Sequence, residues 1–276
     1  MKNSTTWLKS RYLTAGVLLD GTNESITDRQ EKVPGFKQSV MDALCVLQIG
    51  AGGLGGEIAQ GLVRKGVGKL MIFDGDTVES SNLSRQLFYK EDMYKNKATS
   101  LAKNLVKEGI KKTDIEAYPC MFQKAAENKV DIKCNVVVCA PDNDDTRIYV
   151  AKLFYKITPV VFVGLDRQAS TGYIFIQKPN GPCMACALPR TIENKREHCP
   201  NVAAIIDLVK IIAGFVLFAI DSAVMERRSN WNFRQFFIAG FAPEIVRTVE
   251  KKPDCILCGA MKGKVHKKQG AKVKSK

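Results

Sequence analysis

The stretch LCVLQIGAGGLGG, at residues 44–56, predicts a buried strand that ends in a glycine turn. Residues 44–49 form a short apolar run of the kind that fills the middle of a parallel sheet. Glycines let the chain turn tightly and let phosphate oxygens approach main-chain N–H groups without meeting a Cβ atom. A helix expected over residues 57–65 would add the partial positive charge of its N-terminus at the same place. The stretch therefore predicts a phosphate-binding turn.

A second strand is predicted over residues 69–73, and it ends in Asp74. An acid at that strand end is placed to accept hydrogen bonds from ribose hydroxyls. Gly50, Gly52 and Gly55 also satisfy the G-x-G-x-x-G pattern of nicotinamide enzymes. Up to this point an NAD-dependent oxidoreductase and a glycine turn without a ligand both remain open.

The next segment favours a triphosphate over the pyrophosphate of NAD. Residues 74–86 read DGDTVESSNLSRQ, and Lys97 follows Arg85 further along the chain. Two fixed cations and the amide of Asn82, near a phosphate turn, suit the larger charge of a triphosphate.

The order G-x-G-G-L-G, D-x-D-x-V-x-x-S-N-L-x-R-Q and a lysine resembles the ThiF/MoeB/HesA family of ubiquitin-activating-enzyme-like adenylyltransferases. The resemblance runs from about residue 29 to residue 258. It implies an α/β fold with a doubly wound, mostly parallel, Rossmann-like sheet. It also implies ATP-dependent adenylation of the C-terminal carboxylate of a small ubiquitin-like or sulfur-carrier protein that ends in Gly-Gly.

The resemblance implies roles for the residues of an ATP site. The glycines would let phosphate approach the backbone closely, and Asp74 would bind the ribose. Asn82 would orient phosphate, and Arg85 and Lys97 would stabilise its negative charge. Asp142 would bind Mg²⁺. The full expected set is Gly50, Gly52, Gly53, Gly55, Asp74, Asn82, Arg85, Lys97 and Asp142. For Asp142 the alternative is an N-cap carboxylate of the next helix, a role that Asp144 and Asp145 could share.

The segment that enters the domain carries a further catalytic candidate. Arg29-Gln30 followed by Gly35-Phe36 is similar to the family's entry motif. In the family the arginine reaches across a homodimer to the partner's nucleotide, which makes Arg29 the expected trans residue. Arg11 is the alternative candidate for this role. The arginine could also be a solvated surface residue without a catalytic role.

Four cysteines form two C-x-x-C pairs, Cys183 with Cys186 and Cys255 with Cys258, which lie far apart in the sequence. Four thiolates delivered as two pairs match a closed, tetrahedral, structural zinc site. Such a site would fasten a C-terminal strand to the body of the domain. A redox role for one pair is the alternative.

Cys199 is the expected nucleophile of a second chemical step. It follows Lys195 and Arg196 and precedes Pro200 and a long apolar segment. A thiol at a helix N-terminus beside cations has a lowered pKa, and the thiolate is the attacking form. In the family, a cysteine at this distance from the zinc pair often takes the activated carboxylate as a thioester. Other relatives act by adenylation alone.

The charge is uneven along the 276 residues. Of the net +14, the last fifteen residues contribute seven lysines and no acid. We therefore expect an arm at residues 1–28, an adenylation domain at 29–261 and a basic, disordered tail at 262–276. The tail has no aromatic residue for base stacking, so we do not expect nucleic acid as a partner; an acidic protein is the alternative.

Nine cysteines without a secretory signal indicate a reducing, cytoplasmic compartment. Residues 202–225 are strongly apolar, but their uninterrupted part, 211–220, is too short to cross a bilayer, so we expect a core helix. We expect a minimal activator without a rhodanese-like or ubiquitin-fold domain, acting as a homodimer and passing its product to a conjugating enzyme where one exists. A catalytically inactive scaffold is the remaining alternative.

Overall fold

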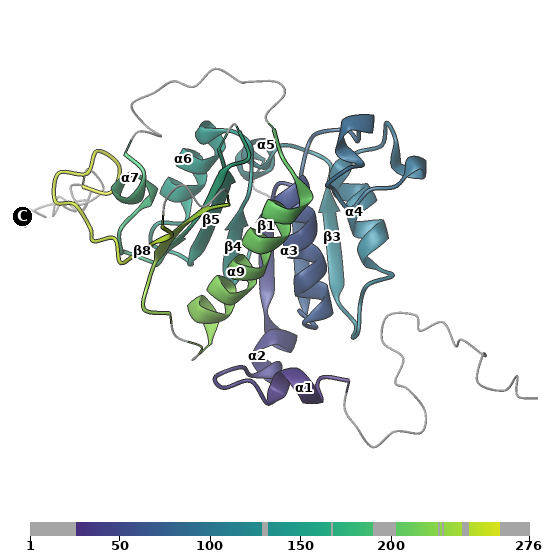
Figure 1. The fold of residues 1–276 in the computed structure, drawn as a ribbon, viewed down its shortest axis with the longest axis horizontal. Coiled ribbons are helices and arrows are strands. Elements are labelled where there is room, and N and C mark those ends of the chain that lie inside the picture. Colours follow the sequence, from purple (N-terminus) through teal and green to yellow (C-terminus); the bar gives the residue numbers. More distant parts are fainter. Residues whose placement is uncertain are drawn as a thin grey trace, which may run out of the picture.

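A computed structural model describes residues 26–128, 132–166, 168–189, 203–225, 227, 229–238 and 243–259. Its strands form one sheet in the order β3-β2-β1-β4-β5-β6-β7-β8 (Figure 1). Their bounds are β1 Cys45–Ile49, β2 Lys69–Phe73, β3 Asp114–Tyr118, β4 Val136–Cys139, β5 Val160–Leu165, β6 Thr171–Gln177, β7 Phe233–Phe237 and β8 Ile245–Arg247.

The sheet is parallel from β3 to β5 and antiparallel from β5 to β8. Val46 of β1 lies opposite Leu70 of β2 and Val136 of β4. All four residues of β4 are buried, because helices cover both faces of the sheet at its centre. The predicted mostly parallel, doubly wound sheet is confirmed.

Two layers of helices cover the two faces of the sheet. The bounds on the first face are α3 Gly53–Arg64, α4 Lys97–Leu105 and α9 Ile206–Val224, and on the second α5 Phe122–Glu127, α6 Asp144–Leu153 and α7 Met184–Ala187. The crossovers after β1 and β2 run on the first face and those after β3 and β4 on the second. The winding therefore reverses between β1 and β4, which is where open sheets of this kind bind ligands, at the carboxyl ends of the strands.

Short helices complete the described part of the chain. They are α1 Asp28–Glu31, α2 Gln38–Ala43 and the 3-10 turns η2 Ser80–Asn82 and η3 Lys90–Asp92. Figure 1 shows α1 and α2 at one end of the sheet, where the chain enters β1. The predicted arm falls mostly, and the basic tail wholly, outside the described residues.

The first helix after the glycine turn begins earlier than predicted. The sequence predicts a helix over residues 57–65, whereas α3 begins at Gly53, with Gly52 as its N-cap. The glycines of the second half of the motif therefore form the first turn of the helix, because nothing in their backbone conformation stops it.

The apolar segment predicted as a core helix is α9, which packs against α3 and the sheet. Its buried Asp221 pairs with Lys65 at the end of α3 and, at 2.6 Å, with Arg227. A buried carboxylate is tolerated because both cations compensate its charge. Among the described residues, no helix is long and apolar enough to cross a membrane.

Candidate functional site

The glycine turn fits tightly against the ends of its neighbouring strands. Gly50 has a φ of +98°, and a Cβ atom there would lie 2.5 Å from Ala140 O, just after β4. A Cβ atom at Gly55 would lie 2.1 Å from Gly50 O. Only glycine fits at either position, because the first needs a left-handed backbone and both need close backbone approach. The turn therefore joins the carboxyl ends of β1 and β4, the point at which the winding reverses.

Gly52 differs from these two glycines. A Cβ atom at Gly52 would meet no protein atom within 4 Å, so the protein's own packing does not require glycine here. The open space lies at the N-cap of α3, where unpaired N–H groups and the helix dipole favour an anion. This open space, which a side chain in place of Gly52 would fill, fits a bound phosphate. Gly53 closes one side, since its Cβ position is 3.4 Å from Arg85 O.

Asp74 lies directly beside the turn. Its Oδ2 accepts a hydrogen bond from Ala51 N at 2.7 Å, and its Oδ1 accepts one from Asp76 N at 2.8 Å. Burial raises the pKa of the Asp74 carboxyl above its ordinary value, and these two backbone donors partly offset the effect. Each carboxylate oxygen can accept a further bond, so the predicted ribose contact is compatible with this geometry.

Lys97 reaches the same place from the first turn of α4. Its Nζ lies 3.1 Å from Asp76 Oδ2, and its backbone N donates to Asp76 O at 2.8 Å. Asn96 caps α4 by accepting from Thr99 N, while its amide donates to Asp74 O at 2.9 Å and Asp76 O at 3.1 Å. The ammonium group is thus fixed close to the Asp74 carboxylate.

The segment between Asp74 and Lys97 brings the backbone of Arg85 to the glycine turn, where Arg85 O lies 3.4 Å from the Cβ position of Gly53. Asn82 is buried, and its Oδ1 accepts from Glu79 N at 3.0 Å, so its carbonyl oxygen closes the turn η2. Arg85 is half-buried and donates to Ser81 O at 2.7 Å. The structure therefore gives Asn82 a local capping role beside the phosphate-orienting role that was predicted.

Asp142 follows β4 and is exposed. The N-cap of α6 is Asn143, whose Oδ1 accepts from Thr146 N at 2.9 Å, so the capping alternative for Asp142 is wrong. Asp144 does not share that capping either, because it forms an ion pair with Arg147 at 2.9 Å. The Asp142 carboxylate, which accepts from Asn143 Nδ2 at 3.2 Å, remains accessible at the strand end and has the oxygen chemistry that Mg²⁺ prefers.

The structure does not bring Arg29 to these residues. Arg29 lies on α1, where its neighbour Gln30 donates to Lys65 O at 3.2 Å, beyond the last residue of α3. The glycine turn is at the other end of α3, a helix about 18 Å long. Arg29 is therefore remote from the glycine turn of its own chain. Arg11 and Cys199 lie outside the described residues.

Two residues of the site were missed by the sequence reasoning, Asp76 and Asn96. Asp76 could have been found as the second acid of the D-x-D motif. Asn96 had the signal of an N-cap residue directly before a helical segment. Their contribution depends on tertiary contacts between the ends of β2 and α4, and these contacts do not follow from local sequence.

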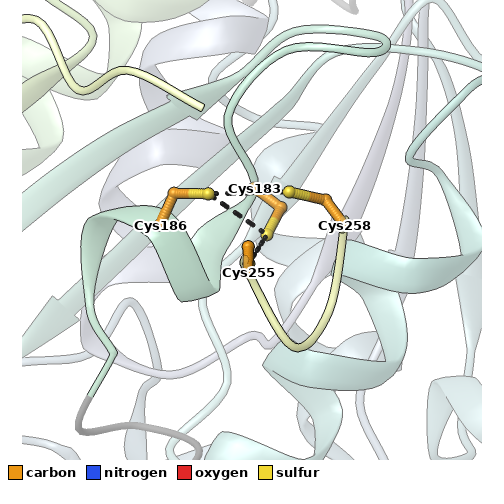
Figure 2. Close-up of side chains that lie close together, drawn as sticks. All are labelled: Cys183, Cys186, Cys255 and Cys258. Carbon is orange, nitrogen blue, oxygen red and sulfur yellow. Dashed lines mark hydrogen bonds between the residues drawn. The ribbon is translucent and has the colours of Figure 1, made fainter. Parts of the chain in front are cut away.

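The four paired cysteines meet in one buried cluster on the second face of the sheet (Figure 2). Their Sγ atoms all lie within 4.8 Å of one another. Cys183 Sγ is 3.9 Å from Cys186 Sγ and 3.5 Å from Cys255 Sγ, and Cys186 Sγ is 3.6 Å from Cys258 Sγ. Tetrahedral coordination with metal–sulfur bonds of about 2.3 Å requires sulfur atoms about 3.8 Å apart. The cluster therefore fits a metal ion with four thiolate ligands.

The surroundings of the cluster disfavour the redox alternative. The two C-x-x-C pairs are not separate sites, because each pair contributes to a single group of sulfur atoms. Cys183 and Cys186 flank the start of α7, while Cys255 and Cys258 lie on the loop that follows β8. Burial raises the pKa of the Cys183 thiol, whereas the backbone donors of Cys258 and Leu257, acting against burial, lower the pKa of Cys255 to about 7 and so favour the thiolate form that a metal ligand needs.

A sequence profile of the ThiF family matches residues 28–257. The adenylyltransferase and sulfurtransferase MOCS3 of Mus musculus is 29% identical over 232 residues, which are 79% of this chain and 48% of the relative. The sulfur carrier protein ThiS adenylyltransferase of Bacillus subtilis is 33% identical, over 56% of this chain and 46% of the relative. The SAMP-activating enzyme E1 of Haloferax volcanii is 30% identical, over 54% of each chain. The chain thus spans about half the length of these curated relatives.

Solved structures agree on the fold. The crystal structure of E. coli MccB with AMPCPP and MccA superposes with a TM-score of 0.72, covering 86% of this chain and 75% of that one. Their sequences are 18% identical, so this likeness concerns the fold alone. Since the family profile spans most of the chain and its motifs carry the turn and the acid described above, the chain belongs to the ThiF family.

Proposed function

We propose that the chain uses ATP to activate the C-terminal carboxylate of a small ubiquitin-like or sulfur-carrier protein. The observation that carries this proposal is the open glycine position, Gly52, beside Asp74 and Lys97 in a chain of the ThiF family. Curated relatives are named as adenylyltransferases or activating enzymes of such proteins. The NAD-dependent oxidoreductase and the inactive scaffold gain no support from these relatives.

The proposed first step is adenylation. A carboxylate oxygen of the carrier's terminal glycine attacks the α-phosphorus of ATP, and the bond from that phosphorus to the pyrophosphate oxygen breaks. The product is a mixed anhydride with AMP, and pyrophosphate leaves. Negative charge gathers on the phosphoryl oxygens in the transition state, and Arg85, Lys97 and the N-terminus of α3 supply fixed positive charge there. In the free protein Lys97 forms an ion pair with the half-exposed Asp76. An arriving phosphate would replace this carboxylate as the partner of Lys97.

The remaining polar residues would hold the nucleotide and its metal ion. Asp74 accepts the ribose hydroxyls, and the backbone of Gly52 and Gly53 accommodates the phosphates. Asp142 would hold Mg²⁺, which neutralises phosphate charge when bound. This assignment is supported by the exposed carboxylate at the end of β4 and by Asn143, rather than Asp142, capping α6.

We further propose that the cysteine cluster holds Zn²⁺ in a structural role. Four protein thiolates fill the tetrahedral positions, so no position stays open for substrate. The cluster would fasten the loop after β8 to α7, joining two pairs that lie far apart in the sequence. A reducing, cytoplasmic environment suits the described cysteines, which are all thiols.

The second step is proposed for Cys199. Its thiolate attacks the anhydride carbonyl, the carbonyl–oxygen bond to AMP breaks, and the carrier is left as a thioester. A conjugating enzyme could then take the carrier by thioester exchange. Support comes from the sequence alone, from Lys195 and Arg196 before this cysteine and the apolar helix after it.

A homodimer is proposed for the role of Arg29. The distance of α1 from the glycine turn of its own chain means that Arg29 could serve only a site of another chain. A second copy supplying this arginine would complete the set of cations around the phosphates.

Adenylation is tested by exchange of labelled pyrophosphate into ATP with Mg²⁺ and a carrier ending in Gly-Gly. We expect exchange by the unchanged protein and a loss of about two orders of magnitude or more for Asp142→Ala, because a metal ligand is removed. Circular dichroism should show that Asp142→Ala keeps its fold. Tight binding of NAD with no binding of ATP, measured by calorimetry, would contradict the proposal.

The zinc site is tested by metal analysis of the purified protein. We expect about one zinc ion per chain and its loss in the double variant Cys255→Ser, Cys258→Ser. Because metal binding is coupled to folding, the Tm of this variant should fall by about 10 °C. The matched control is Cys139→Ser, a buried thiol outside the cluster, which should retain the metal. A metal-free protein of unchanged Tm would sink the assignment.

The shared site is tested with two inactive variants. Arg29→Ala and Lys97→Ala should each lose exchange activity as homodimers. Mixing equal amounts under conditions that allow subunits to exchange should restore up to about a quarter of the activity per site of the unchanged protein. About half of the dimers are then heterodimers, and each heterodimer contains one site with both residues intact. Chromatography must show the dimer. No recovery in proven heterodimers would exclude a trans role for Arg29.

The capture step is tested with Cys199→Ala. This variant should still exchange pyrophosphate, because adenylation needs only the phosphate-side residues, but it should form no thiol-sensitive adduct with the carrier on a non-reducing gel. An adduct that persists in Cys199→Ala would assign the nucleophile to another cysteine. Exchange without any adduct in the unchanged protein would identify an enzyme that only adenylates.

A further inference from the structure

One polar side chain in the centre of the sheet is not explained by packing. Gln48 is 0% exposed and lies on β1 between the apolar residues Leu47 and Ile49. Its Oε1 has no hydrogen-bond partner among the described residues. Burying an unpaired amide oxygen is unfavourable, and an apolar side chain would avoid that cost. A local departure from good packing of this kind is expected where function requires it.

The amide nitrogen of Gln48 contacts both ends of the glycine turn. Nε2 donates to Gly50 O at 3.1 Å and to Gly55 O at 2.9 Å. The orientation of the amide is fixed by these contacts, because the reverse orientation would place Oε1 against two carbonyl oxygens. Gly50 O receives no other donor in the part of the chain that the structure describes.

Each of these carbonyl groups belongs to a planar peptide group whose N–H points the opposite way. The peptide group that carries Gly50 O carries Ala51 N, which donates to Asp74 Oδ2 at 2.7 Å. The peptide group that carries Gly55 O carries Gly56 N, which donates to Gly52 O at 2.8 Å. Gln48 thus holds two peptide groups from the oxygen side, while Asp74 and the first turn of α3 hold them from the nitrogen side.

We infer that Gln48 is a positioning residue for the phosphate-binding turn and for Asp74. It fixes the direction of the peptide group between Gly50 and Ala51, and through Ala51 N it fixes the carboxylate proposed to bind ribose. It also fixes Gly50 O in the space that the missing side chain of Gly55 leaves. Gln48 does not contact the nucleotide. The inference rests on the proposed function, since the ligand it serves is the ATP of that proposal.

The affinity for ATP should depend on Gln48 more than stability does. In Gln48→Met a side chain of similar length fills the core, but neither carbonyl keeps its donor. We expect the Kd of this variant for ATP with Mg²⁺ to rise about tenfold in calorimetry, because the turn no longer holds one conformation. The KM for ATP in pyrophosphate exchange should rise by a similar factor, with a smaller change in kcat.

The matched control is Gln177, another fully buried glutamine of the same sheet. Its Nε2 donates to Ala151 O at 3.0 Å and its Oε1 accepts from Met184 N at 3.2 Å, away from the glycine turn. Gln177→Met should lower the Tm, because two buried backbone groups lose their partners, and should leave the Kd for ATP unchanged. A Kd that rises equally in both variants would show a general structural effect and would overturn the inference.

Gln48→Glu provides a second variant of the same size should Gln48→Met not fold. Its carboxylate cannot donate, whereas its protonated form can donate one hydrogen bond. The ratio of its Kd to that of the unchanged protein should therefore be smaller at pH 6 than at pH 8, and an equal ratio would contradict the inference. If Gln48→Met binds ATP as tightly as the unchanged protein does, the inference is wrong and the proposed function still stands. Absence of ATP binding by the unchanged protein overturns the proposed function and this inference with it.

Discussion

The hydrogen bond from Ala51 N to Asp74 Oδ2 joins the end of β1 to the end of β2, and the rest of the candidate site depends on it. It fixes the glycine turn from one side. Towards α4, the backbone oxygen of Asp74 accepts a hydrogen bond from the amide of Asn96, which caps that helix. Since Lys97 begins that helix, one aspartate connects the glycine turn, the position proposed for ribose and a cation. Burial raises the pKa of this carboxyl. Two backbone donors favour its charged form and so act against the effect of burial.

Sequence predicted the parts of this arrangement that are local. The second strand has the predicted bounds, Lys69–Phe73, because a continuous apolar run with an acid at its end has few other readings. The four clustered cysteines were also predictable, since thiolate pairs bind metals whatever the length of chain between them. The start of α3 was not, because glycine marks a turn in sequence, whereas here the glycines from Gly53 onward continue as helix.

The errors and omissions at the site concern polar side chains whose backbone partners do not follow from the local sequence. Asp142 and Asn143 are both good N-caps, and only the structure shows that Asn143 takes the position. In sequence, Gln48 is one more residue of a predicted strand, although a polar residue in a run buried on both faces was itself a signal. Its meaning depends on two carbonyl groups, and one of them belongs to Gly55, in the first turn of the following helix.

The two candidate sites use the sheet in different ways, which accounts for its mixed direction. The candidate nucleotide site needs the parallel half, where the ends of β1, β2 and β4 meet. The cysteine cluster needs the antiparallel half, because β6 leads to Cys183 and α7, while β7 and β8 return the chain to Cys255 beside it. Four thiolates around a divalent ion carry a net charge of minus two, and this charge has compensation nearby. Lys252 N donates to Cys186 Sγ at 3.5 Å, and Lys251 hydrogen-bonds to Tyr155, a contact that raises the lysine's pKa and keeps it charged. These two groups would stabilise metal-bound thiolates, and the buried sulfur atoms of the cluster are set apart from the candidate nucleotide site in the other half of the sheet.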